Sequence, residues 1–191
     1  GSLYSSRIGH FAANTELYLC ENEAGINTPR RRHVDFLSVG QTISNQQLEK
    51  MWGRTLRLWP NWLLTHMNHA NWLVPGGATH LIGGPTEGDR DVHGLWNRFP
   101  PHLKFNAEEE RQGKAALAEL GVPTDADFVC FHARDSAYLD AVGSHRDPEV
   151  SVGYHDYLDV SVQNFVAAAE RLADNGYYVI RMGAIVKEPL P

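Results

Sequence analysis

Two short apolar runs with an amphipathic helix between them most constrain what this chain can fold into. Residues 128–131 and 177–180 are rich in aromatic and β-branched side chains, which is typical of buried strands. A helix is predicted to begin between them, at Asp159 or Ser161. Its inward face is expected to carry Val162, Phe165, Val166, Ala169, Leu172 and Ala173. This order forms a βαβ unit with parallel strands and a right-handed crossover, so the fold class is predicted to be α/β.

Polar or small side chains follow both predicted strands at the point where each strand ends. They are His132, Arg134, Asp135, Ser136 and Tyr138 after the first strand, and Arg181 and Gly183 after the second. Because the carboxyl ends of parallel strands meet at one edge of a sheet, these residues are expected to lie together, where open α/β sheets bind ligands. The polar connection at residues 140–159 is longer than most and indicates either a functional loop or disorder.

Two arginines at this edge indicate an anionic ligand. The planar guanidinium can donate two parallel hydrogen bonds to a phosphate, and each charge-assisted bond contributes about 1.5–3 kcal/mol. Arg134 and Arg181 would stabilise the charge that develops on a nucleotide diphosphate leaving group. In the alternative interpretation, each arginine pairs with a carboxylate and holds the loop in place. His132 is either a base, a hydrogen-bond donor to the ligand, or a structural group.

Charge and cysteine content exclude several classes of function. The net charge is -6, the pI is about 5.9, and the basic residues form only one short run, at residues 30–32. The chain therefore lacks the basic surface that binds a nucleic-acid backbone. Cys20 and Cys130 form neither a CxxC pair nor a disulfide framework, which favours a cytoplasmic location. No apolar run reaches the roughly 20 residues that span a bilayer, while association with the inner face of the membrane stays open.

The amino-terminal half is predicted to alternate strands and helices. Gly9 precedes a helical segment at residues 11–23, and a glycine at such a turn either lets an anion or sugar approach or simply makes a tight turn. A strand is expected at residues 33–40. Ser44 and Gln47 then form a capping box for a helix that Pro60 ends.

The middle of the chain, residues 61–101, gives a weak pattern. It is interpreted as an acceptor-binding region, a domain junction or an irregular surface connection, with a short strand at residues 79–82. Histidines recur in and just after it, at His66, His69, His80, His93 and His102. No nearby cysteine or carboxylate completes a recognised ligand set, so no metal site is predicted.

Several segments share their pattern with one known family. They are Arg7-Ile8-Gly9-His10, Asn45-x-x-Leu48-x-x-Met51-Trp52, FHARDSAYL from residue 131, Tyr154-His155-Asp156-Tyr157, and GYYVIRMG from residue 176 with Lys187-Glu188-Pro189. Together they resemble a family of bacterial glycosyltransferases of surface-carbohydrate biosynthesis, over nearly the whole chain. The resemblance implies transfer of a sugar from a nucleotide-sugar donor to a surface glycan or a lipid-linked acceptor, without a metal or other cofactor.

The His-x-Arg element is also similar to the first motif of the fucosyltransferase superfamily, His-x-Arg-Arg-x-Asp. His132 and Arg134 match its first and third positions, and in that family the arginine contacts the donor diphosphate. Asp135 and Ala137 stand where the motif has its second arginine and its acidic residue. GDP-fucose is therefore not implied as the donor.

The resemblance implies the GT-B architecture, in which two Rossmann-like domains face each other across a cleft. Residues 1–122 would form most of the acceptor-side domain, and residues 123–191 would begin a donor-side domain that is expected to continue in a longer protein. The implied catalytic residues are His10, His132 and Asp135. The implied substrate-binding residues are Gly9, Arg134, Ser136, Tyr138, Arg181 and Gly183. The alternative is a noncatalytic nucleotide- or sugar-binding module that keeps the same βαβ edge.

Overall fold

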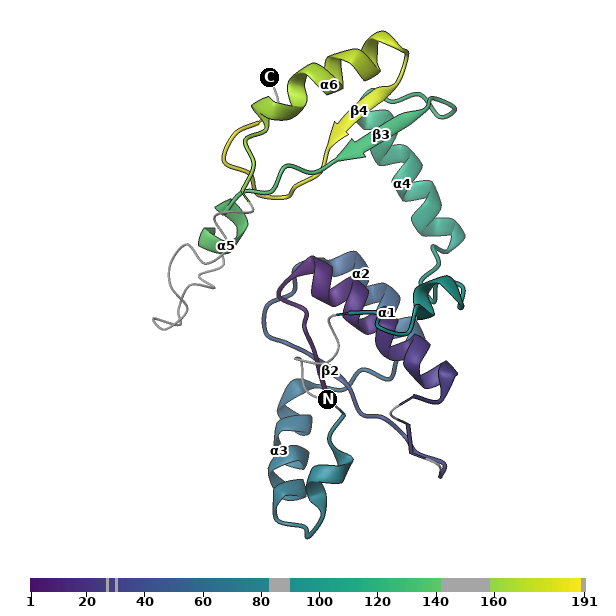
Figure 1. Ribbon diagram of the computed structural model, residues 1–191, viewed down its shortest axis with the longest axis vertical. Helices are drawn as coiled ribbons and strands as arrows, with labels where there is room; N and C mark the ends of the chain where they lie inside the picture. The colour runs from purple at the N-terminus through teal and green to yellow at the C-terminus, as the bar shows by residue number, and fades with distance from the viewer. Residues whose placement is uncertain (27, 30, 83–89, 142–158, 190–191) are drawn as a thin grey trace. The chain divides into compact units, whose positions relative to one another are not determined.

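The computed structural model describes residues 1–26, 28–29, 31–82, 90–141 and 159–189. The chain divides into two compact units, which we call unit 1 (Gly1–Asn106) and unit 2 (Ala107–Pro191). Figure 1 shows helices and short strands in both, and each unit contains a two-stranded parallel sheet. The α/β class is therefore confirmed. The predicted division between residues 122 and 123, with its acceptor-side and donor-side roles, stays a prediction.

The sheet of unit 1 pairs β1 (Ser2–Leu3) with β2 (Ser38–Val39). Leu37 extends the pairing through a parallel bridge to Leu58. The expected strand at residues 33–40 is thus confirmed only around these positions. Upstream of them His33 and Val34 are exposed, so no burial of a face favours an extended ladder there.

Ser5 links the two loops that leave this sheet through hydrogen bonds. Its hydroxyl donates to the carbonyl of Thr42 at 2.8 Å and accepts from the amide of Gly40 at 2.9 Å. Its carbonyl accepts from the amide of Ser44 at 2.8 Å. Ser5 is buried, and these bonds satisfy both its hydroxyl and its carbonyl.

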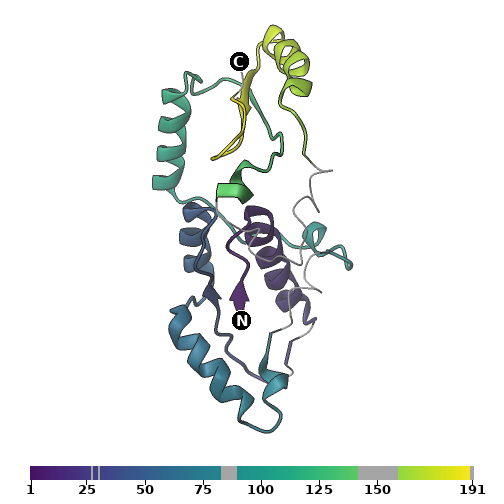
Figure 2. The ribbon, with the colours of Figure 1, turned by 90° about the vertical axis from the view of Figure 1, so that its left-hand side faces the viewer.

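Helices α1 (Ile8–Ala24) and α2 (Gln46–Thr55) follow the two strands and lie side by side (Figure 1 and Figure 2). Trp52 joins them, because its indole Nε1 donates to the carbonyl of Phe11 at 3.0 Å. Both side chains are fully buried. Trp52 and Phe11 are the largest fully buried side chains among the described residues, so this position is a core site of unit 1.

Helix α2 begins one residue later than the predicted capping box implies. Asn45 is its N-cap and accepts from the amide of Leu48 at 2.9 Å, so Asn45 replaces Ser44 in the expected role. The helix ends at Thr55, and Leu56 is extended, with φ -114° and ψ 153°. The early end lets the chain return to the sheet at Leu58.

Pro60 does not end the preceding helix, as the sequence predicts, because α2 stops at Thr55. Pro60 begins the next helix instead. It is the N-cap of α3 (Asn61–Trp72), a helix that the sequence pattern does not predict. The fixed φ of proline suits a helix start as well as a helix stop. A 3₁₀ turn, η1 (Gly77–His80), stands where a short strand is expected, and Thr79 Oγ1 closes it on the carbonyl of Gly76 at 2.7 Å. None of the helices in the described ranges is long and apolar enough to cross a bilayer.

A second cluster of buried side chains joins α1 to the segment around residue 95. It consists of Leu17, Cys20 and Leu95, with Ala24, Ile26 and Phe99 against it. Leu95 belongs to the 3₁₀ turn η2 (Leu95–Asn97). The carboxylate of Asp91 fixes this turn, because it accepts from the amides of Leu95 at 2.7 Å and Trp96 at 2.9 Å.

Unit 2 confirms the order of the predicted strand, helix and strand, but the strands are not buried as expected, since Phe128, Cys130 and Tyr178 are exposed. Ala173 on the helix is also exposed and does not lie on the inward face that the pattern predicts.

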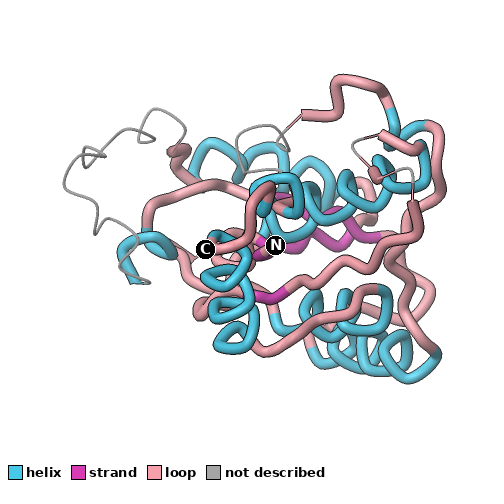
Figure 3. Tube along the Cα trace, turned by 90° about the horizontal axis from the view of Figure 1, so that it is seen from below, coloured by secondary structure: helices cyan, strands magenta, loops and turns pink. Residues whose placement is uncertain are grey.

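The elements of unit 2 are α4 (Ala107–Glu119), β3 (Phe128–Phe131), α5 (Ala137–Ala141), α6 (Gln163–Asp174) and β4 (Tyr178–Arg181). β3 and β4 pair in parallel, with Phe131 opposite Arg181. Helix α6 lies beside this sheet, whose strands are magenta in Figure 3. The ring of Phe165 on α6 stacks on Phe131, with centroids 5.4 Å apart, and this contact holds the helix to the sheet.

A tyrosine and a carboxylate connect α1 to the segment before β2. The hydroxyl of Tyr18 donates to Asp35 Oδ2. Burial, and after it this hydrogen bond and the charge of Asp35, raise the pKa of Tyr18 well above its ordinary value of 10.0. The folded protein thus holds the phenol proton more tightly than the unfolded chain. This contribution to the free energy of unfolding is fully present when the pH is below the ordinary pKa of tyrosine. It is lost as the pH rises through the pKa of Tyr18 in the folded protein.

Replacing Tyr18 with phenylalanine should lower the free energy of unfolding by about 1.5–3 kcal/mol at neutral pH, because a hydrogen bond to a charged group is lost. The difference between the two proteins should shrink above about pH 10, where the unfolded phenol ionises. Urea unfolding at neutral pH and above about pH 10, followed by tryptophan fluorescence, measures this difference in the free energy of unfolding. Tyr4→Phe is the control, since Tyr4 is exposed. A difference that stays constant with pH would contradict the assignment.

Candidate functional site

The carboxyl edge of the β3–β4 sheet brings several of the predicted residues together. The sheet ends where the amide of Met182 donates to the carbonyl of Phe131 at 2.7 Å. Beyond this bond, Asp135 from the β3 side meets Arg181 at the end of β4, with Arg181 Nη2 3.4 Å from Asp135 Oδ2. The parallel register places the two residues on the same edge, as the sequence predicts.

Asp135 is the residue around which this edge is built. Its carboxylate accepts from the amide of Ala137 at 3.0 Å and from the amide of Lys187 at 3.0 Å, in addition to Arg181. The first bond begins α5, and the second fixes the segment after β4. A carboxylate held by three donors is better suited to position its neighbours than to take a proton from a substrate.

Arg181 is the most enclosed charge at this edge. Its side chain is 9% exposed, and Nη1 donates to the carbonyl of Glu188 while Nη2 faces Asp135. Nε is buried and has no hydrogen-bond partner among the described residues. A buried donor without an acceptor costs roughly 1–3 kcal/mol, so Nε is a position where an acceptor from a ligand would be favourable.

Arg134 lies on the loop after β3 and is less enclosed. Its Nε is 4.0 Å from Asp159 Oδ1, and its side chain is 32% exposed. At that distance the two groups form an ion pair, but they are too far apart for a hydrogen bond. The backbone is fixed more firmly than the side chain, because the carbonyl of Arg134 accepts from the amide of Val160 at 2.9 Å.

The other predicted residues of unit 2 differ in their surroundings. His132 is exposed. The hydroxyl of Ser136 donates to Asp140 Oδ2 at 2.7 Å, within the start of α5. Tyr138 is half-buried on α5. Gly183 has φ 152°, and a Cβ there would lie 2.7 Å from Val186 Cγ1, so the chain needs a glycine to turn at this position.

Gly9 and His10 lie in unit 1, in the first turn of α1. Gly9 is therefore helical and is not the turn residue that the sequence predicts, since Arg7 is the N-cap. A Cβ on Gly9 would meet nothing within 4 Å. The His10 ring lies 5.8 Å from the ring of Tyr4, and its Nδ1 is 3.3 Å from Asn14 Nδ2. The prediction that these residues share a cleft with those of unit 2 stays a prediction.

Sequence reasoning missed three contributors to the edge of β3 and β4. They are the amide of Lys187, the carbonyl of Glu188 and the carboxylate of Asp159. Backbone groups leave no side-chain signal in a sequence, so the first two could not have been found. The segment Tyr154-His155-Asp156-Tyr157, which belongs to the family pattern, lies outside the described residues.

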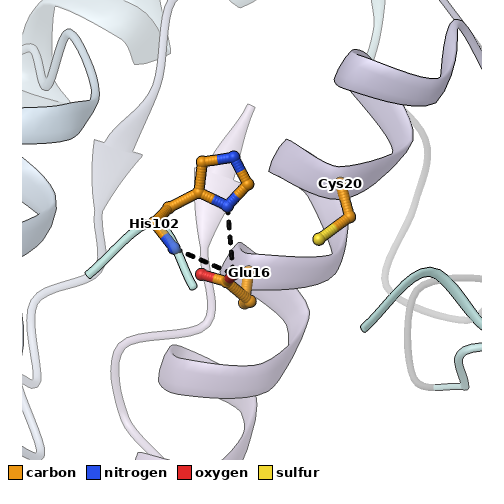
Figure 4. Close-up of side chains that lie close together, drawn as sticks. All are labelled: Glu16, Cys20 and His102. Atoms are coloured by element: carbon orange, nitrogen blue, oxygen red, sulfur yellow. Dashed lines mark hydrogen bonds and ion pairs between the residues drawn. The ribbon is translucent and has the colours of Figure 1, made fainter. Parts of the chain in front are cut away.

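Three possible metal ligands lie close together in unit 1, two of them on α1 and the third at residue 102. Glu16, Cys20 and His102 each offer one ligand atom, and these atoms lie within 4.8 Å of one another (Figure 4). His102 Nδ1 is 3.0 Å from Glu16 Oε1, and Nε2 is 3.2 Å from Glu23 Oε1. The four-residue spacing of Glu16 and Cys20 indicates from the sequence alone that they lie one helical turn apart. Their proximity to His102 could not be predicted from the sequence.

The charges around this cluster favour a cation. Burial raises the pKa of the Cys20 thiol, and the charges of Glu16 and Glu23 raise it further. Burial alone would lower the pKa of His102, but its contacts with the same two glutamates raise that pKa above its ordinary value. The site therefore holds positive charge readily, either as a proton on the imidazole or as a bound cation.

Comparison of the chain with models of protein families, with curated proteins and with solved structures found no match.

Proposed function

We propose that the chain is part of a glycosyltransferase of the GT-B type, and that unit 2 binds the diphosphate of a nucleotide-sugar donor at the carboxyl edge of β3 and β4. The proposal joins two supports. One is the resemblance of the sequence to bacterial glycosyltransferases of surface-carbohydrate biosynthesis. The other is the arrangement of Arg181, Asp135 and Arg134 at an edge where parallel sheets bind ligands.

The observation that carries the proposal is the unsatisfied Nε of Arg181. Nη1 and Nη2 are held by Glu188 and Asp135, so the guanidinium plane is fixed before any ligand arrives. A phosphate oxygen at Nε would satisfy the remaining donor with a charge-assisted bond. Because the plane is already oriented, little side-chain entropy would be lost on binding.

Arg134 would supply the second positive charge. Its 4.0 Å separation from Asp159 leaves the guanidinium without a close hydrogen bond in that pair. The side chain can therefore turn from Asp159 to a diphosphate at low cost. Two arginines would then stabilise the leaving group as the bond to the sugar breaks. In this proposal Asp135 is a positioning residue for Arg181, and the base for the acceptor is His10 or His132.

Replacing Arg134 with alanine should weaken the binding of the cognate nucleoside diphosphate about tenfold to a hundredfold, because one or two charge-assisted bonds are lost. The measurement is calorimetric titration with UDP, GDP, CDP and TDP, supported by thermal shifts. Arg171→Ala is the matched control, since Arg171 is an exposed arginine in the last turn of α6. Equal affinity for Arg134→Ala and the control would contradict the donor site.

A noncatalytic binding module is the second candidate, and the contacts of Asp135 favour it. All three donors that hold this carboxylate belong to the protein itself. Release of nucleoside diphosphate from a nucleotide sugar, measured with an acceptor present, separates the two candidates. Turnover that His10→Ala or His132→Ala abolishes supports the transferase. Tight diphosphate binding without turnover supports the binding module.

A further inference from the structure

The ligand cluster of unit 1 has the composition of a zinc site. Zinc is bound in proteins by thiolate, imidazole and carboxylate, which are the three groups that Cys20, His102 and Glu16 provide. Calcium and magnesium prefer oxygen ligands alone, so a set that includes sulfur and nitrogen disfavours them. Two of the ligands come from one helix, and the third comes from the other end of the unit.

The distances in the cluster are compatible with tetrahedral coordination after small side-chain movements. Zinc lies about 2.0–2.3 Å from its nitrogen, oxygen and sulfur ligands, which puts neighbouring ligand atoms roughly 3.3–3.8 Å apart. His102 Nδ1 and Glu16 Oε1 are already 3.0 Å apart, and all three ligand atoms lie within 4.8 Å of one another. Side-chain adjustments of less than about 1.5 Å would complete the geometry.

A carboxylate beside Nε2 of His102 supports the assignment of this cluster as a zinc site. Glu23 Oε1 lies 3.2 Å from His102 Nε2, on the opposite side of the ring from the contact with Glu16. Metal-binding histidines usually donate their second ring N–H to a carboxylate, which fixes the tautomer and the ring orientation. The backbone amide of His102 also donates to Glu16 Oε1 at 3.1 Å, so Glu16 fixes the backbone of His102 as well as its ring.

We propose that Glu16, Cys20 and His102 bind a zinc ion through Oε1, Sγ and Nδ1, with water as the fourth ligand and Glu23 orienting the imidazole. The ion has a structural role. Cys20 lies about 15 Å along α1 from His10, so the ion would not reach the predicted acceptor residues. Instead it would join α1 to the segment at residue 102, across 86 positions of sequence.

The location of Cys20 argues for a bond to metal over a packing role alone. Its side chain is 1% exposed and packs with Leu17 and Leu95. Its sulfur nevertheless lies within 4.8 Å of the ligand atoms of Glu16 and His102. A residue chosen only to fill this apolar position would not need a thiol beside a carboxylate and an imidazole.

Cobalt is the probe that tests the proposal, because Co²⁺ bound to a thiolate has a charge-transfer band and tetrahedral Co²⁺ has strong visible bands. Metal-free protein titrated with Co²⁺ should develop both, and Zn²⁺ should bleach them at about one ion per chain. Cys20→Ala should abolish the charge-transfer band. Glu23→Gln should keep it but weaken zinc binding about tenfold to a hundredfold, as for other second ligand-shell carboxylates.

Cys130→Ser is the matched control, since Cys130 is the second cysteine of the chain and is exposed in unit 2. It should leave every cobalt band unchanged. Glu16→Gln is a second ligand variant in case Cys20→Ala does not fold, and it should weaken zinc binding while keeping the charge-transfer band. A cobalt spectrum without a thiolate band in the wild-type protein would overturn the proposal. So would a band that Cys130→Ser removes, or zinc affinities equal in the wild type and Glu16→Gln.

Discussion

Replacing Trp52 with alanine should lower the free energy of unfolding of unit 1 by about 3–5 kcal/mol, the range for removing a large aromatic side chain from a core. Trp52 is 0% exposed, and its indole bonds to the carbonyl of Phe11. Alanine would leave a cavity beside α1 that the surrounding side chains fill only in part. Urea unfolding measures the change, and tryptophan fluorescence reports unit 1 alone because all five tryptophans of the chain lie before residue 107.

Two substitutions separate the parts of this effect. Trp52→Phe keeps most of the buried area and loses the hydrogen bond, so it should cost less than alanine. Trp62→Ala removes a tryptophan that is 67% exposed and should change the free energy of unfolding by less than about 0.5 kcal/mol. If Trp52→Ala and Trp62→Ala cost the same, the packing of α1 against α2 does not determine the stability of unit 1.

Replacing Asp135 with alanine should lower the stability of unit 2 by about 3–5 kcal/mol, because breaking an enclosed ion pair leaves the remaining charge without compensation. The side chains of Arg181 and Asp135 are only 9% and 15% exposed. The amides of Ala137 and Lys187 would lose their acceptor as well. Amide hydrogen exchange of peptides from β3 and β4, compared with the wild type, measures the change in unit 2 directly.

Glu188→Ala is the control for this prediction, since Arg181 contacts the backbone carbonyl of Glu188 and not its carboxylate. It should alter exchange in β3 and β4 little. Asp135→Asn should fall between the two, because the amide oxygen still accepts hydrogen bonds while the charge is lost. Wild-type exchange in Asp135→Ala would show that Asp135 does not hold this edge together, and its role as a positioning residue would be wrong.

The elements of unit 2 could be predicted from local pattern. The strand at residues 128–131 was confirmed to the residue, and the strand predicted at 177–180 matches Tyr178–Arg181. Apolar runs this short, bounded by turn residues and separated by a clearly amphipathic helix, leave few alternatives. Parallel pairing then followed from the order of elements alone, and with it the meeting of Asp135 and Arg181.

The elements of unit 1 were harder to predict for physical reasons. β1 and β2 are two residues long each, which is too short for an alternating pattern to be read. The apolar side chains of helix α3 are spread around its axis and form no single face, so the sequence shows no helical period there. The ligands of the proposed zinc site were not predicted, because a metal site joins residues that are distant in sequence. The histidine pattern included His102 but gave no reason to place it beside Glu16 and Cys20 on α1.

Parallel pairing also determines the order in which the chain can fold. Ser2 pairs with Ser38 and Phe128 with Tyr178, so a long stretch of chain lies between the strands of each sheet. Closing such loops costs entropy before the first ladder bond forms, whereas a helix forms from neighbouring residues within about a microsecond. The helices α1 and α6 are therefore expected to form before the two sheets. In refolding experiments, helical circular dichroism should appear ahead of protection in β2 and β4.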